Sequence, residues 1–385
     1  MNDKLGTKRN AFGLALIASA LIFASAAVGQ SANPGTAASS NPQRATDMPL
    51  FENAKVEQRS VARPLSEEIK SWTDGATSAQ WLGYSVPAID NSEHVICCDD
   101  NSNETRNCGS CRLEGRNRGT TFGSKDSGTT KLEGPRYAVI LLRAEAGKIG
   151  RVRVFSEDCT LDAGGLRVTW LADVDPAESV KFLAGLVHSG NFEEHGDRVN
   201  QGALMAIAMH ADAAAETAMQ SFVAPDQLES LRKQTGFWLG SARGAAGEKL
   251  LEKLANSDPS PEVRAQIAFD LFVSKEPAAV DAMIRMAHDD ASTHVRGQAL
   301  FWLAQRAGKK AAQTITGAIE NDPDTEVKKK AVFALSQMPK DEGVPKLIEV
   351  AQNNHNPEVR KQAMFWLGQS GDPRALAFFE KVLSK

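Results

Sequence analysis

Residues 298–305 read QALFWLAQ, and residues 362–369 read QAMFWLGQ, sixty-four positions later. Further copies stand thirty-two residues apart, and self-similarity at such a fixed period is the sequence signature of a repeat architecture. Four columns hold across five copies: an aliphatic residue, a basic residue directly after it, then a phenylalanine and a leucine. The aliphatic column consists of Leu231, Val263, Val295, Val327 and Val359.

A second apolar series with the same spacing supplies another helix for each repeat. Two short amphipathic helices per unit satisfy both series. A weaker sixth copy begins at Val199, with Ala203 and Ile207 at the expected positions. The pattern therefore predicts an all-α solenoid of stacked helical hairpins over residues 175–385. The second series is Val187, Met219, Leu251, Met283, Ile315, Leu347 and Phe379.

An acidic or amide residue stands six positions before each basic residue, between the helices. We expect it to begin a helix, where its side-chain oxygen would accept an orphan backbone N–H. The stretch DDASTHVRGQALFWLA resembles the HEAT repeat in its short bacterial form, related to the phycobilisome lyase group, as found in secreted bacterial proteins. The resemblance covers roughly residues 175–385 and implies a right-handed solenoid whose second helices line a concave surface. It also implies an inter-repeat ladder of Asp226, Arg232, Asp258, Arg264, Asp290, Arg296, Asp322, Lys328 and Arg360.

The phenylalanine column has two interpretations. At 100° per residue each Phe lies about 240° from the aliphatic column, away from a buried stripe centred near 40°. The rings either pack against the adjacent repeat, contributing roughly 1.5–3 kcal/mol each, or form an aromatic ladder that binds a segment of another protein. Asp270 stands where three copies have Trp, and a carboxylate there must be paired or solvated. The candidate partner-binding residues are therefore Phe237, Phe269, Phe301, Phe333, Phe365 and Asp270.

Residues 51–174 show short alternating runs in place of the helical period. These runs predict β-strands, and Ala146-Gly147 predicts a hairpin turn between the second and the third of them. The chain as a whole is therefore predicted to be α+β and multidomain, with a small β-rich domain before the helical solenoid. The predicted strands are residues 80–86, 137–143, 149–155 and 166–171.

All five cysteines lie in the β-rich region. Disulfides are the default in a chain that leaves the cytosol. We therefore expect Cys97 and Cys98 to bridge to Cys108 and Cys111, which leaves Cys159 as a buried thiol. The alternatives are four thiolates around one zinc ion and a redox pair. We expect neither a metal nor a cofactor.

The N-terminus carries the pattern of a cleavable secretory signal. Basic residues up to Arg9 precede an apolar run from Ala11 to about Phe23 and then small residues. The alternative is a retained membrane helix, since the whole apolar stretch approaches the roughly 20 residues needed to span a bilayer. We expect a signal over residues 1–29, a disordered linker over 30–50, and a secreted or periplasmic protein with no membrane span after cleavage.

Charge and motifs narrow the function classes. With 44 basic and 48 acidic residues the net charge is −4, which gives no general attraction to nucleic acid. The seven histidines stand in no recognised motif, and we expect each to be solvated. HEAT-like enzymes such as deoxyhypusine hydroxylase use His-Glu pairs to bind iron, and this sequence contains no His-Glu dipeptide.

These observations predict a non-catalytic scaffold of the cell envelope or exterior. It would bind another protein or a peptide segment along the concave face of the solenoid, and no small-molecule substrate is evident. The alternatives are a HEAT-like oxidoreductase or lyase and a structural envelope component.

Overall fold

The computed structural model describes residues 48–89, 110–114, 136–157, 159–188, 198–306 and 308–384. The predicted signal, most of the predicted linker and Cys97, Cys98 and Cys108 lie outside these residues. The chain divides into the units Met1–Arg44 and Ala45–Lys385, and the described residues belong to the second unit. None of the described helices is both long enough and apolar enough to cross a bilayer.

A mixed five-stranded sheet forms the first part of the unit. Its strand order is β2-β8-β3-β5-β6, and β2 and β8 run parallel while β3, β5 and β6 are antiparallel neighbours. The four predicted strands are confirmed, and the hairpin between β5 and β6 turns at Ala146 and Gly147, which both have positive φ. The bounds are β2 (Lys55–Ser60), β3 (Gln80–Pro87), β5 (Tyr137–Glu145), β6 (Lys148–Ser156) and β8 (Arg167–Ala172).

A smaller parallel sheet packs beside the first. It has the order β1-β7-β4, with β1 (Phe51–Glu52), β7 (Thr160–Asp162) and β4 (Ser110–Arg112). One apolar cluster contains residues of both sheets, among them Trp81, Leu161 and Trp170. The helix α1 (Leu65–Asp74) follows β2.

Cys111 on β4 and Cys159 just before β7 are both buried and disulfide-bonded. The expectation that Cys159 is the left-over thiol was therefore wrong. Its position looked isolated because the three-residue strand that follows it pairs with a segment far away in the sequence.

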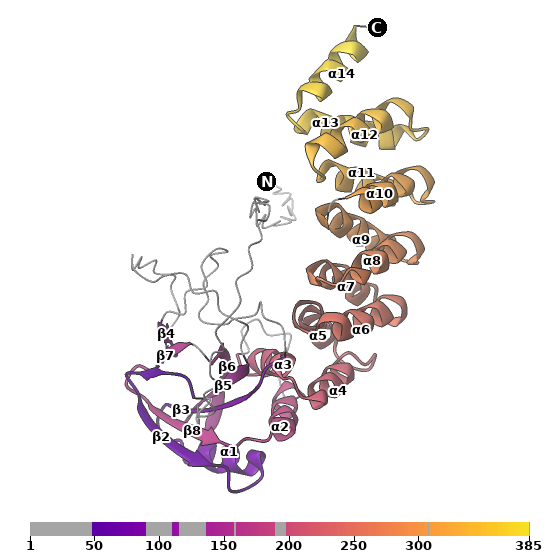
Figure 1. Cartoon of the computed structure of the whole chain (residues 1–385). Helices are drawn as coiled ribbons and strands as arrows, with labels where there is room; N and C mark the ends of the chain where they lie inside the picture. The colour runs from indigo at the N-terminus through magenta and orange to yellow at the C-terminus, as the bar shows by residue number, and fades with distance from the viewer. Residues whose placement is uncertain are drawn as a thin grey trace, which may run out of the picture. The chain divides into compact units, whose positions relative to one another are not determined.

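Thirteen described helices follow the sheets and stack as hairpins in two layers (Figure 1). The odd-numbered helices from α5 to α13 contact one another in one layer, and the even-numbered helices from α4 to α12 form the other. This arrangement confirms the predicted fold class. The bounds are α2 (Pro176–His188), α3 (Asn200–Met209), α4 (Ala213–Phe222), α5 (Glu229–Ala242), α6 (Gly244–Ser257), α7 (Pro261–Val273), α8 (Ala278–Asp289), α9 (Thr293–Arg306), α10 (Lys309–Asn321), α11 (Thr325–Ser336), α12 (Lys340–Asn353), α13 (Pro357–Gln369) and α14 (Pro373–Leu383).

The apolar columns hold the stack together, because the whole aliphatic column and the second series up to Leu347 are buried. The sheet and the helices share one core cluster that continues from Leu82 to Phe378. At their junction α3 lies against the edge strand β6. A Cβ on Gly202 would come within 2.2 Å of the carbonyl oxygen of Val152, so only glycine allows this approach.

Candidate functional site

The exposed side of the odd-numbered layer carries a continuous run of aromatic rings, which we call the aromatic face. Ring centroids lie 6.3 Å apart for Phe237 and Phe269, and 5.9 Å apart for Phe301 and Phe333, both pairs being stacked. Tryptophans connect these pairs, with Phe269 4.8 Å from the ring of Trp302. The face consists of Phe237, Trp238, Phe269, Phe272, Phe301, Trp302, Phe333, Phe365 and Trp366.

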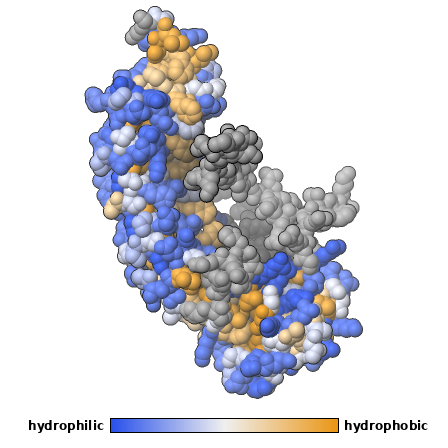
Figure 2. Space-filling model, turned by 180° about the vertical axis from the view of Figure 1, so that it is seen from behind, coloured by the Kyte–Doolittle hydropathy of each residue, from blue (hydrophilic) through white to orange (hydrophobic). Residues whose placement is uncertain are grey.

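These rings are neither fully buried nor free-standing. Most are half-buried, and Phe365 at the far end is 54% exposed. The rings therefore bridge adjacent repeats, as the first interpretation expects, and they also present apolar surface; binding of another protein stays a prediction. Apolar side chains are visible along the side of the helical stack that faces the β-rich region (Figure 2).

A column of polar side chains, amides in four repeats and Lys330 in the fifth, runs beside the rings and was not singled out from the sequence. It stands three residues before each phenylalanine and is half-buried. The signal was present, since the opening octapeptides both begin with glutamine at the same register. An amide offers two N–H donors and a carbonyl acceptor, so it can bond both main-chain groups of an extended peptide. The column is Gln234, Gln266, Gln298, Lys330 and Gln362.

Asp270 does not belong to the binding surface. It is fully buried between α5 and α7, so its assignment as a partner-binding candidate was wrong. The cause is the close approach of the helices: a Cβ on Gly236 would lie 2.4 Å from Asp270 Oδ2, and one on Gly240 would lie 2.2 Å from the Asp270 carbonyl oxygen. A tryptophan has no room at this step of the stack.

The environment of Asp270 disfavours the charged form of its carboxyl group. The amide of Gln266 donates to Oδ1 at 3.0 Å, while Oδ2 has no hydrogen-bond partner among the described residues. Burial raises the pKa of Asp270 well above its usual range, because desolvation disfavours the charged form. The carboxyl group of Asp270 is thus part of the packed core between the two helices.

The predicted ladder forms three ion-paired rungs. Each arginine reaches the aspartate of the next repeat with two N–H groups, and Nε–Oδ2 distances are 3.0 Å for Arg232–Asp258, 2.7 Å for Arg264–Asp290 and 2.8 Å for Arg296–Asp322. The paired side chains are at most 14% exposed. These are buried bidentate pairs, which are stronger and more directional than exposed ones.

The ladder prediction was wrong at its two ends. Asp226 is exposed and has no described arginine partner, because the preceding copy has Asn200 at the register of the basic residue. Lys328 instead donates to the carbonyl oxygen of Glu320. Arg360 donates to the carbonyl oxygen of Asn354, and Asn354 itself carries no charge to complete a rung.

The acidic residues also sit two positions earlier than a helix cap. Asp258 accepts the N–H of Ser260 at 2.9 Å, and Ser260 is the residue that caps α7. Asp322 accepts the N–H of Asp324 in the same way, and Asp324 caps α11. The expectation that these aspartates begin the helices was therefore wrong, since they fold the turn ahead of the cap and leave their outer oxygens for the arginine.

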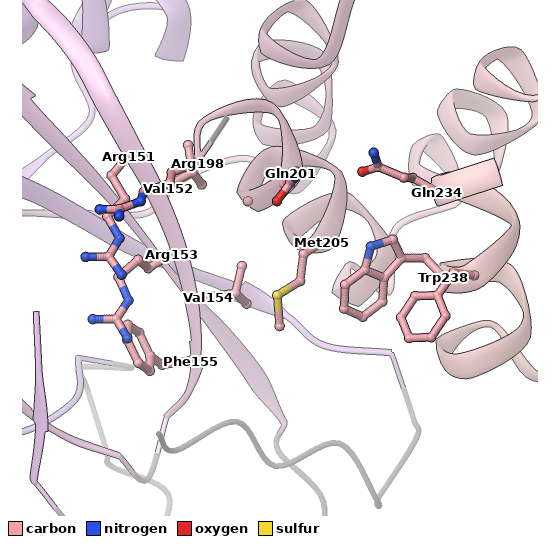
Figure 3. A pocket seen from close by; sticks show the side chains of 12 residues that line it. Arg151, Val152, Arg153, Val154, Phe155, Arg198, Gln201, Met205, Gln234 and Trp238 are labelled. Carbon is pink, nitrogen blue, oxygen red and sulfur yellow. The ribbon is translucent and has the colours of Figure 1, made fainter. Parts of the chain in front are cut away.

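A pocket of about 500 Å³ lies where β6 meets α3 and α5 (Figure 3), and we call it the junction pocket. One wall carries Arg151, Arg153 and Arg198. The other wall carries Met205 and Trp238, so the pocket opens onto the start of the aromatic face. Its remaining lining residues are Val152, Val154, Phe155, Gln201, Gly202, Gln234 and Phe237.

A buried hydrogen-bonded chain links β3, α2 and α3. His210 Nδ1 lies 2.7 Å from the carbonyl oxygen of Ala206, so Nδ1 carries the proton and Nε2 accepts from Ser179 Oγ at 3.0 Å. Ser179 in turn accepts from the Tyr84 hydroxyl at 2.9 Å. Burial lowers the pKa of His210 to about 4. The expectation of solvated histidines was wrong here.

A hydrogen-bonded Ser–His pair is also the arrangement of an activated nucleophile. Ser179, His210 and Tyr84 are each fully buried, however, and none of them lines a described pocket. A substrate has no path to the serine, and the chain is a structural connection between sheet and solenoid. Among the described residues, no three His, Cys, Asp or Glu side chains are grouped so that they could hold a metal ion.

A family model described as HEAT repeats matches residues 247–336 and 313–385. The chain contains HEAT repeats. No curated protein matches it. Among solved structures, human deoxyhypusine hydroxylase in complex with glycerol is similar, with a TM-score of 0.23 and 18% identity over 54% of this chain and 85% of that chain.

Proposed function

We propose that this protein is a non-catalytic scaffold that binds an extended segment of another protein along the aromatic face. The observation that carries the proposal is the half-exposed run of nine aromatic rings across five repeats. Aromatic side chains dominate the energetics of protein interfaces. The run continues through the repeat that has Ala334 in place of Trp, because Phe333 lies 4.9 Å from the ring of Trp366.

The amide column supports an extended partner in particular. An extended peptide lacks internal hydrogen bonds, so its main-chain N–H and C=O groups need partners when its side chains are buried. Gln234, Gln298 and Gln362 beside the rings supply both kinds of partner, whereas Gln266 already donates to Asp270 and Lys330 offers donors only. The repeating rings would then accept apolar side chains of the same segment.

We place the protein outside the cytosol. The N-terminal sequence has the composition of a secretory signal, and disulfides such as those of Cys111 and Cys159 persist in oxidising compartments. Cell fractionation with an antibody to the mature chain tests this: recovery in the cytosolic fraction with the signal retained would contradict it.

The binding proposal is tested with the full mature chain. A phage library of random decapeptides is panned against the immobilised protein, and enriched sequences are synthesised with a fluorescent label for polarisation measurements. Phe269, Phe301 and Phe333 are half-buried and pack against rings of adjacent repeats. Phe365 is 54% exposed and contacts Trp366 of its own helix, so it gives the cleaner substitution. We expect Phe365→Ser to weaken binding about tenfold, since truncating an aromatic anchor costs on the order of 1–2 kcal/mol.

The matched control is Leu376→Ser on α14. Leu376 is 62% exposed and lies on α14, whereas the rings of the aromatic face lie on α5, α7, α9, α11 and α13. It should leave the affinity unchanged. Equal affinities for wild-type protein, Phe365→Ser and a Phe301→Ser/Phe365→Ser double variant that retains its helical circular dichroism would refute binding at this face.

A further inference from the structure

The junction pocket combines two chemistries that the aromatic face alone does not offer. Guanidinium groups gather on the β6 side, and apolar side chains face them from α3 and α5 (Figure 3). A ligand that enters the pocket therefore meets positive charge on one side and apolar surface on the other.

The arginine wall is positioned by the strand and by main-chain acceptors. Arg151 and Arg153 stand two residues apart on β6, so they project from the same face of the sheet. Their Nη1 atoms donate to the carbonyl oxygens of Leu113 at 3.4 Å and Arg112 at 2.6 Å, respectively. The guanidinium of Arg153 also lies 4.5 Å above the Phe155 ring. These contacts hold both groups in defined directions.

The third arginine comes from the other side of the junction. Arg198 lies directly before α3, and its carbonyl oxygen accepts the N–H of Val152 at 3.1 Å. This bond fastens the start of α3 to the edge of β6. The exposed side chain of Arg198 thereby adds a third positive charge to the row on β6, although it is far from that row in the sequence.

The opposite wall continues into the aromatic face. Trp238 and Phe237 line the pocket, and Phe237 stacks on Phe269 of the next repeat. Met205 adds a flexible apolar surface that adapts to different side chains. A chain segment lying on the aromatic face would thus reach the arginines at its end without leaving apolar contact.

We infer that the segment bound by this protein is acidic at the end that enters the junction pocket, with a carboxylate next to an apolar residue. This inference rests on the proposed function. The carboxylate pairs with the arginine row, which suits planar, two-point recognition of such a group. The neighbouring apolar side chain packs between Met205 and Trp238, while the remainder of the segment follows the rings.

The experiment compares each enriched decapeptide with a twin in which every Asp and Glu is replaced by Asn or Gln. We expect the acidic peptide to bind the full chain at least about tenfold more tightly than its neutral twin, because hydrogen bonds to charged groups contribute roughly 1.5–3 kcal/mol. Raising the salt concentration should narrow this ratio. A ratio near one would overturn the inference.

Substitutions of the arginines test whether the preference for the acidic peptide arises in the junction pocket. Arg151→Gln/Arg153→Gln/Arg198→Gln should bind both peptides equally, and Arg198→Gln alone should lower the ratio with no structural change, since its side chain is exposed. Arg167→Gln on β8, also exposed, is the matched control and should keep the full ratio. A ratio that survives the triple substitution would also overturn the inference.

The two proposals fail in distinguishable ways. Phe365→Ser should weaken both twins by the same factor and so preserve their ratio. If Phe365→Ser weakens peptide binding but the acidic and neutral twins bind equally, the inference about the carboxylate is refuted. The proposed scaffold function is then still supported. A library that yields no binding sequence would refute both proposals together.

Discussion

Replacing Arg296 with methionine should destabilise the centre of the solenoid by several kcal/mol. Arg296 donates Nε to Asp322 Oδ2 at 2.8 Å and Nη2 to Oδ1 at 3.0 Å, and Nη1 donates to the carbonyl oxygen of Asp290 at 2.8 Å. Methionine keeps most of the apolar stem but removes all three bonds. Asp322, whose side chain is 6% exposed, would be left as an uncompensated buried charge, which costs about 3–5 kcal/mol.

Lys328 provides a matched control one repeat further along. It occupies the same column, but faces the neutral Asn354 and donates only to a main-chain oxygen of Glu320. Lys328→Met should therefore cost no more than about 1 kcal/mol. Both variants are compared with wild type by urea denaturation followed by circular dichroism at 222 nm. Because repeat arrays can unfold in parts, hydrogen exchange of α9 and α10 should accompany the melt.

A second substitution tests the physical cause. If the uncompensated charge is responsible, Arg296→Met/Asp322→Leu should recover much of the lost stability, because an apolar pair of similar volume replaces a buried ion pair at little cost. The reasoning is refuted if Arg296→Met is no more destabilising than Lys328→Met. It is also refuted if removing Asp322 as well makes the protein less stable still.

Three further outcomes follow from buried groups. The pKa of His210 lies near 4 in the folded chain against 6.5 ordinarily, so about 3 kcal/mol of stability present above pH 6.5 should be lost as the pH falls to 4; His210→Gln should abolish that slope in urea melts. Asp270 has a raised pKa, so its own contribution to stability should fall as the pH rises above 4, and Asp270→Asn should gain stability relative to the wild type between pH 4 and pH 7. Gly240→Ala should destabilise by about 1–3 kcal/mol through overpacking, whereas Gly317→Ala, whose added Cβ meets nothing within 4 Å, should stabilise by up to about 1 kcal/mol in thermal melts.

The helical half of the fold could be predicted from the sequence because the same pattern of apolar and basic residues recurs in each repeat. Burial of the aliphatic column followed from the period, and the pairing of Arg264 with Asp290 was expected from the resemblance to HEAT repeats. The burial of Asp270 was not predicted because it depends on Gly236 and Gly240 on α5, and these two glycines depart from the repeat pattern. The residue pattern of one helix does not show that two neighbouring helices approach each other more closely at one position.

The sheet region was predicted less completely. The strands with alternating apolar residues, such as β5, were found, but β2 carries the exposed sequence KVEQRS and offers no apolar signal. The junction pocket could not have been foreseen at all. Arg151 and Arg153 stand visibly together in sequence, yet Arg198 joins them only through the bond from Val152 and the fit of α3 against β6.

The hydrogen bond from Val152 to Arg198 and the close contact of Gly202 with Val152 attach the first helices of the array to the sheet. Each hairpin touches only its neighbours, whereas the first helices are anchored to a folded platform. Hairpins should therefore be removable one at a time from the α14 end, each truncation leaving a shorter folded protein. A cut between β8 and α3 should instead leave two fragments with bare apolar faces, and neither would be expected to fold alone.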